Sequence, residues 1–158
     1  MPFCASLAWF IHFFFPCLTY IFCIYQSSKS SKSNRKLKGA VKKAIKVMEE
    51  RAKDSRWNYS NKLHLLEAES FSSNGHNTLA IKSYKAAIEA SKSSRFIHEQ
   101  GLACELAAIH CKNKKVKDLD TSLTYFREAK ACYEQWGSQP KVDAMIQQID
   151  IMIQRQGT

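Results

Sequence analysis

Apolar side chains recur at steps of three and four residues through most of the chain after residue 36, which is the spacing of helices that bury one face. Short polar breaks divide this pattern into six segments. The pattern predicts an all-α domain over residues 37–155, built of antiparallel helical hairpins. Its helices are expected near residues 37–54, 59–73, 77–92, 96–112, 120–136 and 140–155.

Two of these hairpins follow one another between Asn58 and Trp136. Gly75 can take the left-handed conformation that ends a helix, and Asn58 or Ser60 can cap the start of the first hairpin. In the second hairpin, Asp118, Asp120 or Thr121 can cap the later helix. Its earlier helix is expected to bury Phe96, Leu102, Ala103, Leu106, Ala107 and Ile109, and its later helix Leu123, Phe126, Ala129, Ala131 and Tyr133.

The last segment is expected to be a capping helix. Gly137 ends the helix before it, and Pro140 suits a first helical turn. One side is apolar and is expected to pack inward: Val142, Met145, Ile146, Ile149, Met152 and Ile153. The other side is polar, as the outer face of a terminal helix should be: Gln147, Gln148, Asp150, Gln154 and Arg155.

A different pattern occupies the N-terminus. Residues 3–25 contain no charge apart from a protonated His12, and about 23 residues suffice for a helix to cross a bilayer. A signal peptide is disfavoured because no basic residue precedes the apolar run and no small-residue cleavage site follows it. The abrupt change of composition at Gln26 also allows a gene-model artefact. The preferred interpretation is a transmembrane or membrane-anchor segment over residues 1–26.

Positive charge gathers directly after this segment. Eleven of the 24 basic residues, against three acidic ones, lie between Ser27 and Arg56. The positive-inside rule then predicts a single-pass protein whose C-terminal domain is cytosolic, or a cytoplasmic protein if the leader is an artefact. Residues 27–36 form a Ser/Lys-rich linker, which serves either to adhere to anionic lipid head groups or as a plain spacer.

The segment 37–54 is both basic and amphipathic. Its apolar stripe either lies on a membrane or packs on the next helix, and the second alternative is favoured. The stripe comprises Leu37, Val41, Ala44, Ile45, Met48 and Ala52.

The cysteines suggest a reducing compartment. Cys4, Cys17 and Cys23 lie in the leader, and Cys104, Cys111 and Cys132 lie in the helical region, with no CxxC pair among the six. A helix-rich chain of this kind favours free thiols over a disulfide framework.

No constellation of catalytic residues is present, so the chain is not expected to be an enzyme. Cys104 and Cys111 share a helix face, with His98 and His110 nearby in sequence. Zinc needs four converging ligands, and His110 lies about 240° around the helix from Cys104. The sequence therefore predicts neither a metal nor a cofactor.

Residues Ala68, Phe71, Gly75, Ala80, Tyr84 and Ala87 resemble the tetratricopeptide repeat, with its small and aromatic residues on two helices and a glycine between them. The second hairpin departs from that pattern, since His110 stands where an aromatic residue is usual and Ser122 where alanine is usual.

Residues 41–145 are also similar to the helical region that follows the AAA-type ATPase module in large eukaryotic hybrid serine/threonine–histidine sensor kinases, most closely over 96–108 and 133–142. The catalytic motifs of those proteins are missing here: there is no Walker A loop, H-box, DFG-like triplet or receiver aspartate. The resemblance implies a protein-interaction or spacer segment.

In a tetratricopeptide-like stack, the first helix of each pair lines a groove for a protein or peptide partner. The resemblance places these residues in such a groove: Lys62, Leu65, Glu69 and Ser72, then Gly101, Cys104, Ala108 and Cys111. The alternative is that two hairpins and a cap are too short to curve into a groove, since about three repeats are normally needed.

The sequence thus favours a non-catalytic, membrane-anchored adaptor that contacts the membrane through residues 3–25 and the basic linker. The alternative is a truncated helical coupling segment of a multidomain signalling kinase or ATPase. No specific nucleic-acid partner is expected.

Overall fold

The computed structural model describes residues 31–113, 116 and 118–156, with side chains from residue 38 to residue 154. The expected membrane segment 1–26 and the first part of the expected linker lie outside this range. Residues 31–36, the rest of that linker, belong to a helix.

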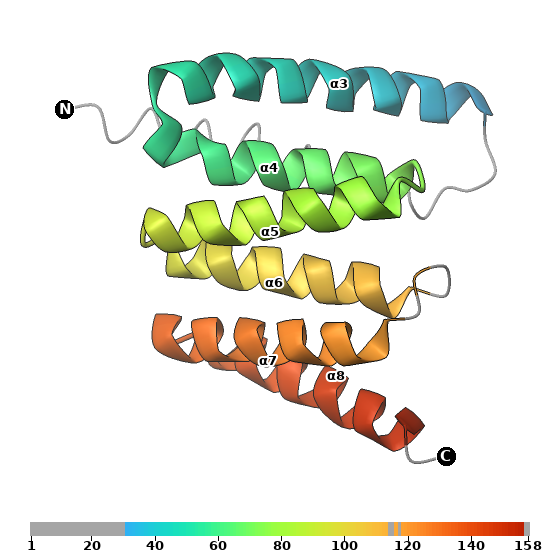
Figure 1. Ribbon diagram of the computed structural model, residues 1–158, viewed down its shortest axis with the longest axis vertical. Coiled ribbons are helices and arrows are strands. Elements are labelled where there is room, and N and C mark those ends of the chain that lie inside the picture. Colours follow the sequence, from blue (N-terminus) through green and yellow to red (C-terminus); the bar gives the residue numbers. More distant parts are fainter. Residues whose placement is uncertain (1–30, 114–115, 117, 157–158) are drawn as a thin grey trace. The chain divides into compact units, whose positions relative to one another are not determined.

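The regular elements of the described residues are all helices, which confirms the predicted all-α class. Its helices are α3 (Ser31–Asp54), α4 (Arg56–Ser73), α5 (Asn77–Ser93), α6 (Ile97–Lys112), α7 (Leu119–Trp136) and α8 (Gln139–Gln156) (Figure 1). They form two compact units, which divide within α5 between Ser83 and Tyr84. None of the described helices is long and apolar enough to cross a membrane.

In the first unit, α3 packs along α4 (Figure 1). The apolar stripe of α3 is buried through Val41, Ala44, Met48 and Ala52. The stripe therefore packs within the protein, as favoured from the sequence, and leaves the lysines of α3 on the outside.

The ends of α4 differ in how well the sequence located them. Gly75 takes a left-handed φ of 79°, and the amide of His76 donates to the carbonyl of Phe71 at 2.9 Å, so this turn ends as expected. The start was misplaced: α4 begins at Arg56 after Ser55, so Asn58 and Ser60 lie inside the helix and do not cap it.

In the second unit, α6 lies beside α7, and α7 beside α8 (Figure 1). Small residues of α6 face larger ones of α7, which allows the two helices to approach closely. Fully or almost fully buried side chains here include Ala103, Cys104, Ala107, Ala108 and Cys111 of α6, and Phe126, Ala129, Cys132 and Tyr133 of α7. Asp118 caps α7 by accepting from the Thr121 amide at 3.1 Å, and Gly137 ends it with φ 82°.

Four residues expected inside the helical core lie on the surface instead. Ile109, Ile146 and Ile153 are 46%, 39% and 48% exposed, and Ala131 is also exposed. The side chains that α6 and α8 bury occupy other positions around each helix, and α8 is covered chiefly through Val142, Met145 and Met152. Periodicity locates an apolar face, but the neighbouring helices decide how much of that face they cover.

Candidate interaction surfaces

Most residues of the predicted groove are buried in the structure. Lys62 and Leu65 are buried on α4, where the Lys62 ammonium donates to the Asn58 carbonyl at 2.8 Å, while Glu69 and Ser72 are half-buried. The others, Gly101, Cys104, Ala108 and Cys111, are buried on α6. Of the predicted set, the side chains of Glu69 and Ser72 therefore have the most surface to offer a partner.

Two departures of the second hairpin from the tetratricopeptide pattern have a structural role. The Ser122 hydroxyl is fully buried and donates to the Ala108 carbonyl at 2.8 Å, which links α7 to α6. The His110 ring is 4% exposed and lies 5.5 Å from the Tyr84 ring, centroid to centroid. Both residues thus belong to the core of the second unit.

A polar cluster joins three helices of the same unit. The Glu105 carboxylate of α6 accepts a hydrogen bond of 2.6 Å from the Tyr133 hydroxyl of α7 and one of 2.9 Å from the Lys141 ammonium of α8. Burial raises the pKa of Tyr133, and the hydrogen bond to Glu105 raises it further. Tyr133 is only 2% exposed, so its hydrogen bond to the Glu105 carboxylate is a structural link between α6 and α7.

The buried thiols are poorly suited to nucleophilic chemistry. Burial raises the pKa of Cys104 well above its ordinary value, with the nearby Cys132 and Glu128 adding to the effect, and burial raises the pKa of Cys111 to about 11. The thiolate is the reactive form, and both side chains are fully buried. Among the described residues, no group of three or more His, Cys, Asp or Glu side chains is arranged to hold a metal ion.

These thiols should therefore resist alkylation. Treating the full chain with iodoacetamide at pH 8 should label Cys104 and Cys111 at least about a hundredfold more slowly than in urea, as followed by peptide mass spectrometry. Rapid labelling of Cys104 in the folded protein would contradict this assignment.

The free energy of unfolding should also fall as pH rises from 9 toward 11, because the unfolded thiols lose protons that the folded ones retain.

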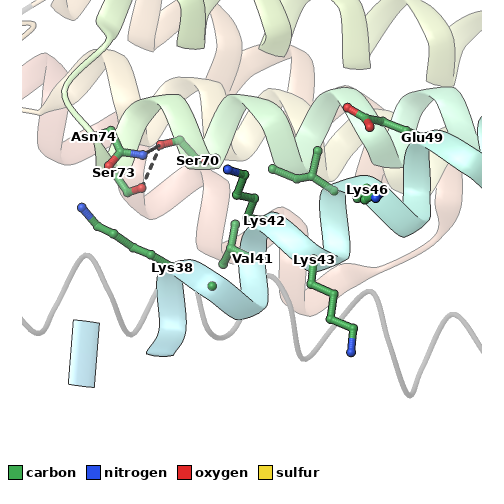
Figure 2. A pocket seen from close by; sticks show the side chains of 11 residues that line it. Lys38, Val41, Lys42, Lys43, Lys46, Glu49, Ser70, Ser73 and Asn74 are labelled. Atoms are coloured by element: carbon green, nitrogen blue, oxygen red, sulfur yellow. Dashed lines mark hydrogen bonds between the residues drawn. The ribbon is translucent and has the colours of Figure 1, made fainter. Parts of the chain in front are cut away.

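The first unit carries a basic cleft along the contact between α3 and α4 (Figure 2). Its volume is about 780 Å³, and its charged lining consists of Lys38, Lys42, Lys43, Lys46 and Glu49 of α3. The far wall is the C-terminal end of α4. There the Ser73 hydroxyl and the Asn74 side-chain amide both donate to the Ser70 carbonyl, at 2.9 and 2.7 Å.

The second unit carries an apolar edge on α8. Ile146, Ile149 and Ile153 follow one another at spacings of three and four residues, so they line one side of the helix. Ile149 is half-buried and the other two are exposed. Beside them, Asp143 and Asp150 border a hollow of about 540 Å³ that Ile146 also lines. The sequence located these isoleucines on the apolar side of the last helix, but the expectation that they pack inward was wrong for Ile146 and Ile153, which are exposed.

An exposed aromatic pair lies at the junction of α6 and α7. The Trp136 side chain is 51% exposed, and its ring lies 5.5 Å from the His98 ring, at an interplanar angle of 32°. Tyr133 lies beneath it, with ring centroids 6.4 Å apart. Trp136 thus contacts two rings while about half of its surface stays exposed.

Comparison with known proteins adds no relative. No protein-family model matches the chain, and no curated protein or solved structure matches it.

Proposed function

We propose that the chain is a non-catalytic protein-interaction module of the tetratricopeptide-like kind, held at a membrane by residues 3–25. Its partner presents an amphipathic helix, which packs against the apolar edge of α8. The single observation that carries the proposal is that the apolar face of α8 is wider than α7 covers, so Ile146 and Ile153 stay exposed beside buried Met145 and Met152.

The spacing of the exposed isoleucines supports a helical partner. Anchors at positions i, i+3 and i+7 match the way one helix packs its apolar face against another. Asp143 and Asp150 flank these anchors and would favour lysine or arginine on the partner. Ile146 and Ile153 are already more than half buried, so covering their remaining exposed 39% and 48% would contribute about 0.6–1.4 kcal/mol each.

The exposed edge also suggests a test by substitution. Replacing Ile146 and Ile153 together with glutamine should weaken partner binding about tenfold or more, because the anchors lose their apolar burial. The fold should persist, since both side chains are exposed. The measurement is the amount of bound protein that remains after washing of the tagged full chain, purified from its native cells.

The matched control is Thr124→Ala combined with Arg127→Ala, which alters exposed polar positions of α7 outside the hollow. It should leave binding unchanged. Equal retention of partners by the isoleucine variant and by the unaltered chain would refute a role for this edge.

Membrane anchoring is tested separately by alkaline extraction of the full chain carrying a C-terminal tag. The anchored protein should stay in the membrane pellet. Its release into the soluble fraction would refute membrane anchoring by residues 3–25. The alternative, a helical coupling segment of a larger kinase or ATPase, would be favoured by an ATPase reading frame continuous with Lys36.

A further inference from the structure

The basic cleft of the first unit has a chemistry that the proposed interaction at α8 does not use. Lys38, Lys42 and Lys46 of α3 lie at successive spacings of four residues, so they form one line along the helix, which we term the lysine ridge. All three side chains are exposed, while the apolar stripe of α3 is buried beside them. Packing on α4 therefore turns the ridge toward solvent.

The ridge carries a charge that its surroundings leave largely unbalanced. Glu49 is the one acidic residue among positions 38–49, which hold four lysines. Glu50 pairs with Lys53 at 3.0 Å, and no lysine of the ridge forms an ion pair with a side chain that the structure describes. Lysines spaced by four residues repel one another, so an anionic partner would relieve a cost already present in the helix.

The opposite wall of the cleft indicates what kind of anion fits. Figure 2 shows Lys38 and Lys42 reaching toward the end of α4, whereas Lys43 points away from it. That end is a helix C-terminus, which carries partial negative charge. The Ser73 hydroxyl there is already bonded to the Ser70 carbonyl, as is one of the two N–H groups of the Asn74 side chain. The positive charges of the cleft therefore all come from α3, where the three ridge lysines are spread over about two turns of the helix.

A spread of charge along a helix suits an extended anionic surface. The sequence places this ridge shortly after the uncharged residues 3–25. Residues 31–37 belong to α3, and the five residues 26–30 span at most about 18 Å when fully extended. A chain anchored through residues 3–25 would therefore keep the ridge close to the head groups, at a high effective concentration. Each basic residue near an anionic bilayer adds about fivefold to the binding equilibrium.

We infer that the lysine ridge of α3 binds the anionic head-group surface of a lipid bilayer, and so fixes the first unit against the membrane. This inference rests on the membrane anchoring in the proposed function. Its consequence is that the adhesion depends on lipid charge and on salt, whereas the anchor itself does not.

The test measures how fast individual lysines are acetylated in the full chain reconstituted into vesicles. In vesicles with about 30% phosphatidylserine, Lys42 and Lys46 should react at least threefold more slowly than in phosphatidylcholine vesicles, and 0.5 M salt should abolish the difference. Lys82 and Lys92, which are exposed on α5, serve as internal controls and should react equally in both. Equal rates for Lys42 and Lys46 in the two vesicle types would overturn the inference.

Variants and a competing ligand sharpen the result. Lys42→Gln with Lys46→Gln should remove the protection of Lys38, whereas Lys82→Gln with Lys92→Gln, an equal change of charge, should keep it. Circular dichroism verifies that both variants stay helical. If duplex RNA protects these lysines from acetylation and phosphatidylserine vesicles do not, the ridge binds nucleic acid and the inference of bilayer binding is overturned.

Failure of this inference is distinguishable from failure of the anchor. If the chain stays in the membrane pellet at alkaline pH but its lysines show no protection, the anchor is supported and bilayer binding by the ridge is overturned. If the chain is extracted, yet floats with phosphatidylserine vesicles through Lys42 and Lys46, bilayer binding by the ridge is supported and the anchor is overturned.

Discussion

Replacing Phe126 with alanine should lower the free energy of unfolding of the second unit by about 3–5 kcal/mol. Phe126 is among the largest fully buried side chains, on the helix that contacts both α6 and α8. Its removal takes away apolar burial and leaves a cavity that the flanking helices cannot fill completely. Urea unfolding of the full chain in mild detergent, followed by circular dichroism, measures the loss.

Arg127→Ala is the matched control for Phe126→Ala, because Arg127 is the next residue on α7 and is exposed. It should change stability by no more than about 0.5 kcal/mol. A loss of less than about 1 kcal/mol for Phe126→Ala would mean that the α7 contacts are not the core of this unit.

Replacing Gly101 with alanine should destabilise the second unit by about 1–3 kcal/mol, even though alanine is the better helix former. A β-carbon at this position would lie 2.9 Å from Cε1 and 3.1 Å from Cδ1 of Tyr133, and 3.2 Å from Cβ of Cys132. Tyr133 cannot readily move away, because its hydroxyl is bonded to Glu105. The added methyl group would therefore push α6 away from α7.

Gly39→Ala provides a control with the opposite sign. Gly39 also lies within a helix, but among the described residues no atom beyond its chain neighbours and the adjacent helix backbone is within 4 Å of the place where its β-carbon would be. Alanine there should stabilise α3 by about 0.5–1 kcal/mol. Hydrogen exchange reports the two effects separately, as faster exchange in α6 and α7 for Gly101→Ala and slower exchange in α3 for Gly39→Ala. Slower exchange throughout α6 in Gly101→Ala would contradict the close approach.

Local sequence signals predicted the helices well. The spacing of apolar residues fixed the all-α class, and turn residues such as Gly75, Asp118 and Gly137 act where they were expected. These signals are local because they depend on the φ angle or capping group of one residue. Ser60 failed as a helix start because α4 continues upstream to Arg56.

The surfaces were harder to predict, because they depend on which neighbour covers each helix. Ile109, Ile146 and Ile153 follow the apolar periodicity yet remain exposed. The cluster of Glu105, Tyr133 and Lys141 joins residues far apart in sequence, and no local pattern brings them together. Gly101 gave a usable hint, since an isolated glycine inside a helix often marks a close contact.

The predicted groove illustrates the same limit. Cys104, Ala108 and Cys111 share one helix face, as the periodicity required, but α7 lies against α6 and that face is buried. The exposed isoleucines Ile146 and Ile153 lie on α8, on the apolar side that was expected to pack inward. The partner surface proposed from the structure therefore lies on α8, whereas the predicted groove lay on α4 and α6.

Photo-cross-linking from α8 tests the central claim most directly. A photoreactive amino acid placed at Ile146 or Ile153 of the full chain in its native cells should give a discrete adduct to a protein partner. The same group at Arg127, exposed on α7, should give none. If neither α8 position gives an adduct at a higher yield than Arg127, the assignment of α8 as the partner-binding edge is contradicted.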